Sequence, residues 1–198
     1  TTVLTTAGGQ PLIAPNDIVF DADGGFWFTD HGTRTNEALR LGSLCYARAD
    51  STDAVLVRPG LISPNGVGLS PDGATLYVAD TWTGRLLSFE IVGPGEVKPA
   101  PIFQPGHVIA TLPGFQLLDS LAVEADGRIC VGTMVNGGIT IFSPLGDFEH
   151  VALPDALVTN ICFGGEDMRD VWITCSGTGT LRKGRWPRPG LKLHFSGN

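Results

Sequence analysis

Residues 64–80 read PNGVGLSPDGATLYVAD, and the fold can be predicted from this segment and its repeats. Its second residue is Asn65, and an alternating apolar run follows up to a turn at Asp72-Gly73. A second alternating run then leads to Asp80. Asp-Gly between two such runs is typical of a β-hairpin, because the central residues of the favoured tight turns adopt positive φ. We therefore expect two short antiparallel strands here.

Three diverged copies of this pattern occur elsewhere in the chain. They begin at Asn16 (NDIVFDADGGFWFTD), at Asp119 (DSLAVEADGRICVGT) and, more loosely, at Asn160 (NICFGGEDMRDVWIT). Together with Asn65, these opening residues are separated by 49, 54 and 41 positions. Such spacing is typical of a four-stranded propeller blade, which repeats every roughly 40 to 50 residues. The sequence therefore predicts an all-β fold, a β-propeller of about four blades, with the opening residues at the same place on successive inner strands.

The segments between the hairpins supply the outer strands. We expect these at residues 1–4, 42–47, 54–58, 86–91, 101–103, 139–142, 150–152, 180–185 and 191–195. No amphipathic helix is evident. Since residues 1–4 resemble the last strand of a preceding blade, we expect residues 1–198 to form a single propeller domain that lacks one to two N-terminal blades.

The composition limits the classes of partner. The 198 residues include 27 Gly and 14 Pro, only 17% are charged, and 42% are hydrophobic, which favours short strands and turns around a sizeable core. A net charge of -7 disfavours nucleic acid and anionic membranes, since both attract clustered Lys and Arg. The chain contains neither a signal-peptide pattern nor an apolar stretch of about 18 residues.

The four cysteines, Cys45, Cys130, Cys162 and Cys175, show no close metal-type spacing. We expect them to be buried reduced thiols, which indicates a cytoplasmic location. The chain also lacks a G-x-S-x-G elbow, a P-loop, an H-E-x-x-H pair and a dinucleotide fingerprint. Among enzymes, this leaves metal-assisted hydrolysis.

Asn16, Asn65 and Asp119 would bring oxygen atoms to the propeller axis. Calcium prefers six to eight such oxygens, and the three side chains carry one negative charge between them, so strong binding would need a further carboxylate. An Asn or Asp before a strand can instead make a local Asx-turn. Both interpretations are open at this point.

The segments at 15–30 (PNDIVFDADGGFWFTD), 64–80 and 118–133 (LDSLAVEADGRICVGT) resemble the SMP-30/gluconolactonase family of calcium-dependent propeller lactonases. This family includes drug-responsive lactonases and, more distantly, paraoxonase and diisopropylfluorophosphatase. The resemblance extends from about Thr1 to Phe195. It implies a six-bladed propeller with a divalent metal, usually Ca²⁺, at the top of the central channel.

The resemblance also implies roles for individual residues. Asn65 matches a metal ligand, Asp119 matches an Asp that binds metal and acts as base or nucleophile, and Asn16 matches an Asn on the metal or beside the substrate. The family's fourth ligand, a Glu in the first blade, has no counterpart in this chain. Asp17 would correspond to a residue at a second calcium in distant relatives, although an ordinary turn carboxylate is an equal alternative.

Several other side chains are candidates for lesser roles. His31, after the second strand of the first repeat, could orient substrate or simply be a hydrogen-bonded loop residue. Asn160 could line the pocket as a substrate-binding residue. Asp30 and Asp80 each end a second strand, and we expect backbone amides in the turn that follows to satisfy them.

We therefore predict a metal-dependent hydrolase that opens a sugar lactone or another small lactone, with Asp119 as base. Ca²⁺ is the expected cofactor, with Zn²⁺, Mn²⁺ or Mg²⁺ as alternatives. The expected partner is a small-molecule lactone, not nucleic acid or membrane, and the oligomeric state is open. The alternatives are a non-catalytic propeller scaffold for binding and an inactive part of the lactonase that lacks the first-blade Glu.

Overall fold

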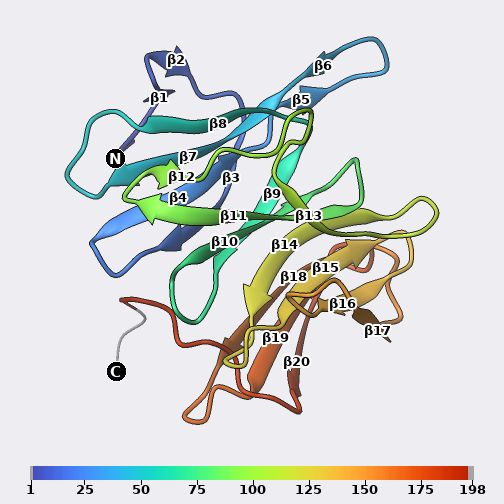
Figure 1. The fold of residues 1–198 in the computed structure, drawn as a ribbon. Helices are drawn as coiled ribbons and strands as arrows, with labels where there is room; N and C mark the ends of the chain where they lie inside the picture. Colours follow the sequence, from blue (N-terminus) through green and yellow to red (C-terminus); the bar gives the residue numbers. More distant parts are fainter. Residues whose placement is uncertain (1, 196–198) are drawn as a thin grey trace.

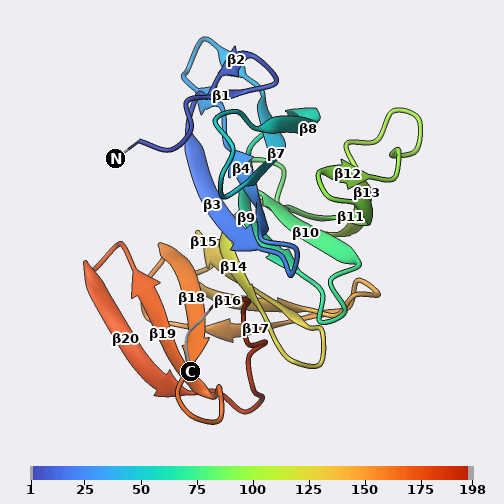
Figure 2. The ribbon, with the colours of Figure 1, turned by 90° about the vertical axis from the view of Figure 1, so that its left-hand side faces the viewer.

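The computed structural model describes residues 2–195 and confirms the all-β propeller arrangement. Four antiparallel sheets follow one another along the chain, from the blue and green sheets to the yellow and red ones in Figure 1. Their first strands lie side by side at the centre, and the later strands fan outward (Figure 2). Within residues 2–195 there is no helix, and hence none long and apolar enough to cross a membrane.

Each sheet runs from an inner to an outer strand. The first has the order β3 (Pro15–Phe20), β4 (Gly25–Asp30), β7 (Gly42–Arg48) and β8 (Val55–Leu61). The second contains β9 (Pro64–Leu69), β10 (Thr75–Asp80) and β11 (Arg85–Gly93), and β11 also pairs with β12 (Glu96–Val97) and β13 (His107–Thr111). The third contains β14 (Leu117–Val123), β15 (Ile129–Met134), β16 (Gly138–Phe142) and β17 (Phe148–Ala152). The fourth contains β18 (Val158–Gly164), β19 (Asp170–Cys175) and β20 (Thr180–Arg185).

Two short ribbons complete the strand list. β1 (Thr6–Ala7) pairs with β2 (Gln10–Pro11). β5 (Thr33–Arg34) pairs with β6 (Leu39–Arg40) in a hairpin between β4 and β7. The Arg34 guanidinium of this hairpin lies 4.5 Å from the centre of the Trp82 ring, which links the first sheet to the second.

Apolar side chains fill the spaces between consecutive sheets. Trp27 and Leu76 belong to a buried cluster shared by the first and second sheets, and Phe142 and Leu86 belong to one shared by the second and third. The inner strands approach closely where glycine replaces a side chain. A Cβ on Gly66 would lie 2.6 Å from the backbone nitrogen of Leu121, so β9 and β14 can meet only with glycine at this position.

Three strand predictions are wrong. Residues 101–103 form no strand, because Pro101 lacks an N–H and Phe103 has a φ of 64°, and β13 occupies the outer position instead. Residues 191–195 form no strand, and the Leu191 amide instead donates to the Val123 carbonyl of β14 at 2.8 Å. Of residues 1–4, Thr1 lies outside the described residues and the other three form no strand.

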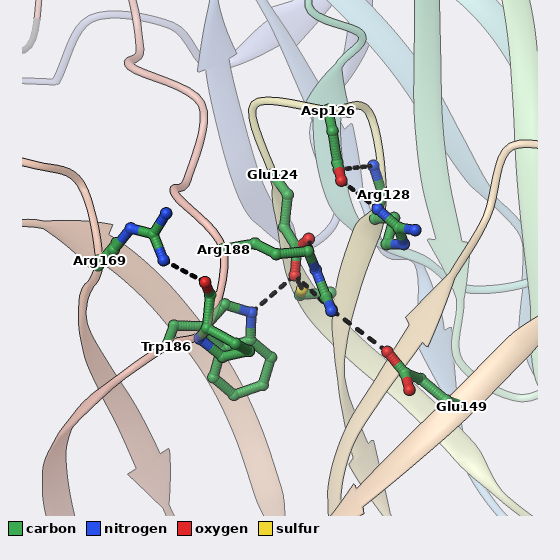
Figure 3. A network of polar contacts seen from close by, with 9 residues as sticks. Glu124, Asp126, Arg128, Glu149, Arg169, Trp186 and Arg188 are labelled. Carbon is green, nitrogen blue, oxygen red and sulfur yellow. Dashed lines mark hydrogen bonds and ion pairs between the residues drawn. The ribbon is translucent and has the colours of Figure 1, made fainter.

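The segment after β20 is fixed to the third sheet by a buried polar cluster around Glu124 (Figure 3). The Glu124 carboxylate accepts hydrogen bonds from Trp186 Nε1 at 2.6 Å and from Arg188 Nη2 at 3.1 Å, and Arg188 Nε also donates to it. The Cys130 thiol adds a fourth contact at 3.2 Å. Hydrogen bonding to Glu124 raises the pKa of Arg188 above its ordinary value.

The cysteines are all free thiols, as predicted, but only three are buried. Cys162 on β18 is exposed, because its side chain lies on the face of the inner strand that borders the central channel. Burial raises the pKa of the Cys45 thiol to about 11 and also raises that of Cys130. Cys45 and Cys130 are therefore neutral packing groups.

Candidate active site

A β-bulge occurs at the same place in every inner strand, close to where the strand begins. In the first sheet Pro15 pairs with Asp30 and Ile18 with Phe28, so two residues of β3 lie opposite one residue of β4. The pairing shifts in the same way after Pro64 in β9, after Leu118 in β14 and after Val158 in β18. Bulges re-aim side chains. The two bulged residues are Asn16 and Asp17, Asn65 and Gly66, Asp119 and Ser120, and Thr159 and Asn160.

The fourth repeat begins one residue earlier than the sequence pattern suggested. The shift in its pairing falls between Val158 and Asn160, so Thr159 occupies the place that Asn65 and Asp119 occupy in their sheets. The interpretation of Asn160 as the fourth member of this series is therefore wrong. The Thr159 hydroxyl lies 2.8 Å from that of Thr174 on the same sheet.

Aspartates at the ends of the second strands hold the start of the inner strands in place. Asp30 accepts a hydrogen bond from the Ile13 amide at 2.8 Å. Asp80 accepts one from the Ser63 hydroxyl at 2.8 Å and one from the Ser63 amide at 3.4 Å. These amides precede the inner strands, so they are not the amides of the turns that follow Asp30 and Asp80. Both carboxylates nonetheless have a structural role, as expected. They position the residues that lead into the first two bulges.

Thr29 joins the bulges of the first two sheets. Its buried hydroxyl donates to the Asn65 carbonyl at 2.6 Å and accepts from the Asp17 amide at 3.2 Å. The Asp17 carboxylate in turn accepts from the Ile18 amide at 2.8 Å and from the Val67 amide on β9 at 3.2 Å. Backbone and side chain together therefore fix Asp17 against the second sheet.

Asp119 is the centre of the site. Burial raises the pKa of its carboxyl group, while hydrogen bonding with Asn65, the charge of His31 and the Ser120 amide act in the opposite direction. The same interactions show that Asn65, from the preceding sheet, and His31, from the first, lie next to Asp119. The site thus forms where inner strands begin and second strands end.

Asp17 approaches the same point. Burial raises its pKa, the nearby Asp119 charge raises it further, and hydrogen bonds from the Ile18 and Val67 amides and from Ser120 lower it. Two carboxylates from different sheets therefore share one partly buried region. Asp17 thus joins His31 as a residue of the first sheet that interacts with Asp119.

Asn65 supplies an oxygen atom with no partner. Its side chain is 5% exposed, and its Nδ2 donates to the Thr81 hydroxyl at 3.1 Å. Among the described residues nothing donates to its buried Oδ1. A buried amide oxygen without a donor is costly unless a cation or a ligand satisfies it. Asn65, whose side chain also hydrogen-bonds with Asp119, therefore has a free amide oxygen that fits a hard divalent cation.

The remaining predicted residues lie at the edges of this group. Asn16 is exposed and, with Asp17, lines a pocket on the side of β3 away from β9. Asn160 is exposed and lines the central channel. The His31 amide donates to the Ala14 carbonyl at 2.9 Å, and its ring lies 3.5 Å from the Gly32 carbonyl oxygen. No three His, Cys, Asp or Glu side chains within residues 2–195 converge in a metal-type cluster.

The central channel contains a cavity of about 200 Å³. All four inner strands line it, and so do Leu191 and Leu193 of the segment that follows β20. Asp17 and Asn160 supply its polar groups. Sequence reasoning missed Thr29, Thr81 and Ser120, because an isolated Thr or Ser next to a strand carries no recognisable signal.

Comparisons with known proteins identify relatives of this chain. The sequence profile of the SMP-30/Gluconolactonase/LRE-like region matches residues 1–177. A lactonase drp35 from Staphylococcus haemolyticus is 32% identical over 136 residues, which is 66% of this chain and 39% of the relative. The drp35 lactonase of Staphylococcus epidermidis is 30% identical over 135 residues, with the same coverage.

Solved structures show the same fold. One that is provisionally described as a gluconolactonase is 26% identical, with a TM-score of 0.74 over 94% of this chain and 63% of that one. A gluconolactonase from Xanthomonas campestris has a TM-score of 0.73 at 24% identity, over 92% of this chain and 60% of that one. Regucalcin from Agrobacterium tumefaciens, described as a calcium-binding protein, has a TM-score of 0.72 at 19% identity, over 90% and 65% of the two chains.

The chain spans about two fifths of the length of the curated relatives that it matches. Its four sheets correspond to part of the six-bladed gluconolactonase propeller. The repeated hairpins, the bulges that carry Asn65 and Asp119, and the profile match over residues 1–177 lead to one assignment. The chain belongs to the SMP-30/gluconolactonase/LRE-like family.

Proposed function

We propose that this chain forms part of a divalent-cation-dependent hydrolase that opens a small lactone. The drp35 relatives are lactonases by name. One observation carries the proposal: the buried Oδ1 of Asn65 has no donor, and the same side chain interacts with Asp119 of the next sheet. Family membership supports the reaction class, and the bulges explain how strands 54 residues apart supply one site.

Asn65 and Asp119 would hold the cation through oxygen atoms. Oxygen ligands suit Ca²⁺, Mg²⁺ and Mn²⁺ better than Zn²⁺, and the description of regucalcin as calcium-binding favours Ca²⁺. Asp17 supplies a second carboxylate close by, which increases the negative charge that the sequence alone placed there. A cation bound at such a site supplies Lewis-acid polarisation of a carbonyl oxygen.

Asp119 is the proposed general base. Burial raises its pKa, which makes the carboxylate a better proton acceptor than an exposed Asp. In this scheme Asp119 takes a proton from water as the water oxygen bonds to the lactone carbonyl carbon. The ring C–O bond then breaks and the ring oxygen takes up a proton, which gives a hydroxy acid.

Neighbouring residues hold Asp119 and the substrate in place. His31 interacts electrostatically with Asp119, so it is the residue proposed to orient a lactone oxygen. The hydrogen bond between Ser120 and Asp17 keeps the second carboxylate turned toward the site. Asn160 lines the channel and can contact the ring substituents of a sugar lactone.

The test compares Asp119→Asn with a surface control, Asp126→Asn. The wild-type chain should release acid from δ-gluconolactone in a pH-stat assay faster than buffer does, and Asp119→Asn should lose this excess. Added Ca²⁺ should raise the thermal midpoint of the wild type and of Asp126→Asn but not that of Asn65→Leu or Asp119→Asn.

Each alternative predicts a different result. A binding scaffold predicts neither hydrolysis nor cation-dependent stabilisation. A lactonase site that is incomplete without the first-blade Glu predicts stabilisation by Ca²⁺ without hydrolysis. Full activity of Asp119→Asn would contradict the assignment of the base.

A further inference from the structure

A second cavity lies between the first two sheets, outside the central channel. It has a volume of about 530 Å³ and is bounded by the end of β8, by the start of β11 and by the segment at residues 100–105. Of the residues described at the candidate active site, only the structural carboxylate Asp80 lines it. Its volume falls within the range of about 300–1,000 Å³ that is usual for small-molecule sites.

Arg85 contributes a guanidinium group that lacks a partner. Its Nε is buried, and among the described residues no acceptor receives a hydrogen bond from it and no carboxylate forms an ion pair with it. Asp80 lies opposite Arg85 in the pairing of β10 with β11, but both of its oxygens accept from Ser63. Since a buried N–H without an acceptor is destabilising, an external acceptor would be favourable here.

A second arginine builds the outer wall of the cavity. Arg58 Nε donates to the Pro105 carbonyl at 2.9 Å, and its Nη2 donates to the Gln104 carbonyl at 2.8 Å. These bonds hold the segment at residues 100–105 over the cavity. Two guanidinium groups and the single carboxylate of Asp80 leave the lining with one net positive charge, in a chain whose net charge is -7.

The rest of the lining is largely apolar. Leu87 forms part of the floor and is fully buried, and Ile62 lies at the side. Ile102 and Phe103 lie on the covering segment, and their exposure is unusual for such large side chains, since Ile102 is 82% exposed and Phe103 is fully exposed. A cationic group next to apolar surface matches a ligand with an anionic head and a hydrocarbon body.

We propose that this cavity binds a small organic monocarboxylate. The planar guanidinium of Arg85 pairs with the carboxylate, because Arg presents two parallel N–H donors that match its oxygens. The hydrocarbon part lies against Leu87, Ile62 and Ile102. A single net positive charge and the nearby Asp80 favour a monoanion over a phosphate dianion.

The site does not depend on the proposed lactonase activity. Its residues come from β8, β11 and the segment that precedes β13, whereas the candidate active site comes from the bulges of the inner strands. Both walls belong to consecutive sheets of this chain, so the 198-residue protein contains the whole cavity.

The test is calorimetric titration of the 198-residue chain with phenylacetate and with its uncharged analogue phenylacetamide. Phenylacetate should bind at least about tenfold more tightly than phenylacetamide, because only the carboxylate can form charge-assisted bonds with Arg85. The substitution Arg85→Gln should weaken the binding of phenylacetate by at least the same factor. Arg182→Gln, which alters an exposed arginine on β20, should leave the affinity unchanged.

A second variant tests the apolar wall without disturbing the fold. Ile102→Ser replaces an exposed apolar side chain with a small polar one. It should weaken the binding of phenylacetate by about fourfold, the equivalent of one buried methylene, and should have little effect on the binding of acetate. Equal affinity for the acid and the amide would overturn the proposal. So would tighter binding of inorganic phosphate than of phenylacetate, or an equal loss of affinity in Arg85→Gln and Arg182→Gln.

Discussion

Neutralising Glu124 should destabilise the whole chain, because this carboxylate is fully buried and links residues more than 60 positions apart. It is 0% exposed and contacts Trp186, Arg188 and Cys130 at once (Figure 3). In Glu124→Gln, the shape is kept and one oxygen still accepts from Trp186, but the charge that faces Arg188 is lost. Breaking a buried pair in this way costs about 3–5 kcal/mol.

We expect the lower end of this range for Glu124→Gln. The Arg188 side chain is 29% exposed and also reaches Glu149 at 3.2 Å. Water and this second carboxylate therefore partly compensate the guanidinium for the loss of the Glu124 charge. A loss of about 3 kcal/mol is nonetheless a large fraction of the 5–15 kcal/mol that is typical of domains. Urea unfolding followed by tryptophan fluorescence measures this loss.

The matched control is Asp126→Asn on the same hairpin. Asp126 pairs with Arg128, but both side chains are more than 40% exposed, so this change should cost less than about 1 kcal/mol. A double-mutant cycle with Arg188→Gln isolates the coupling between Glu124 and Arg188. Equal losses in Glu124→Gln and Asp126→Asn, or a coupling near zero, would refute the reasoning.

Four further predictions address the inner strands, the thiols and the pH dependence. Thr29→Val removes the hydroxyl that joins two bulges and should cost about 1–3 kcal/mol in chemical denaturation; a loss below about 0.5 kcal/mol would show that the bulges hold without it. Gly66→Ala should cost at least about 1 kcal/mol in the same assay, because its Cβ would meet the backbone of β14, and an unchanged midpoint would contradict this contact. Ellman's reagent should modify Cys162 rapidly in the native chain and the other three cysteines only in denaturant, and rapid reaction of more than one thiol would count against their burial. Hydrogen bonding to Thr178 lowers the pKa of Asp155, so the stability that this carboxylate contributes is present above about pH 4 and is lost as the pH falls through its folded pKa. The stability difference between wild type and Asp155→Asn should accordingly shrink in acid, and a difference that grows there would reverse the sign of the inferred shift.

The propeller could be predicted from the sequence because its signals are local. Asp72-Gly73 and its counterparts set tight turns, and alternation on either side sets which face of each strand is buried. Asn65 and Asp119 could be selected for the same reason, since each opens a copy of the repeat. Outer strands were predicted less well, as residues 101–103 and 191–195 show, because their state depends on which neighbouring edge is available.

Tertiary structure alone decided what those residues face. A bulge is a property of two paired strands, so only the register shows that Thr159 precedes Asn160 in the series, and only the packing of the sheets brings Asp17 close to Asp119. The partner of Glu124 and the unpaired state of Arg85 depend equally on segments brought together from distant parts of the chain. Local pattern determines which strands form and which way they turn, whereas burial, pKa and partnership arise from packing between sheets, which a linear pattern does not encode.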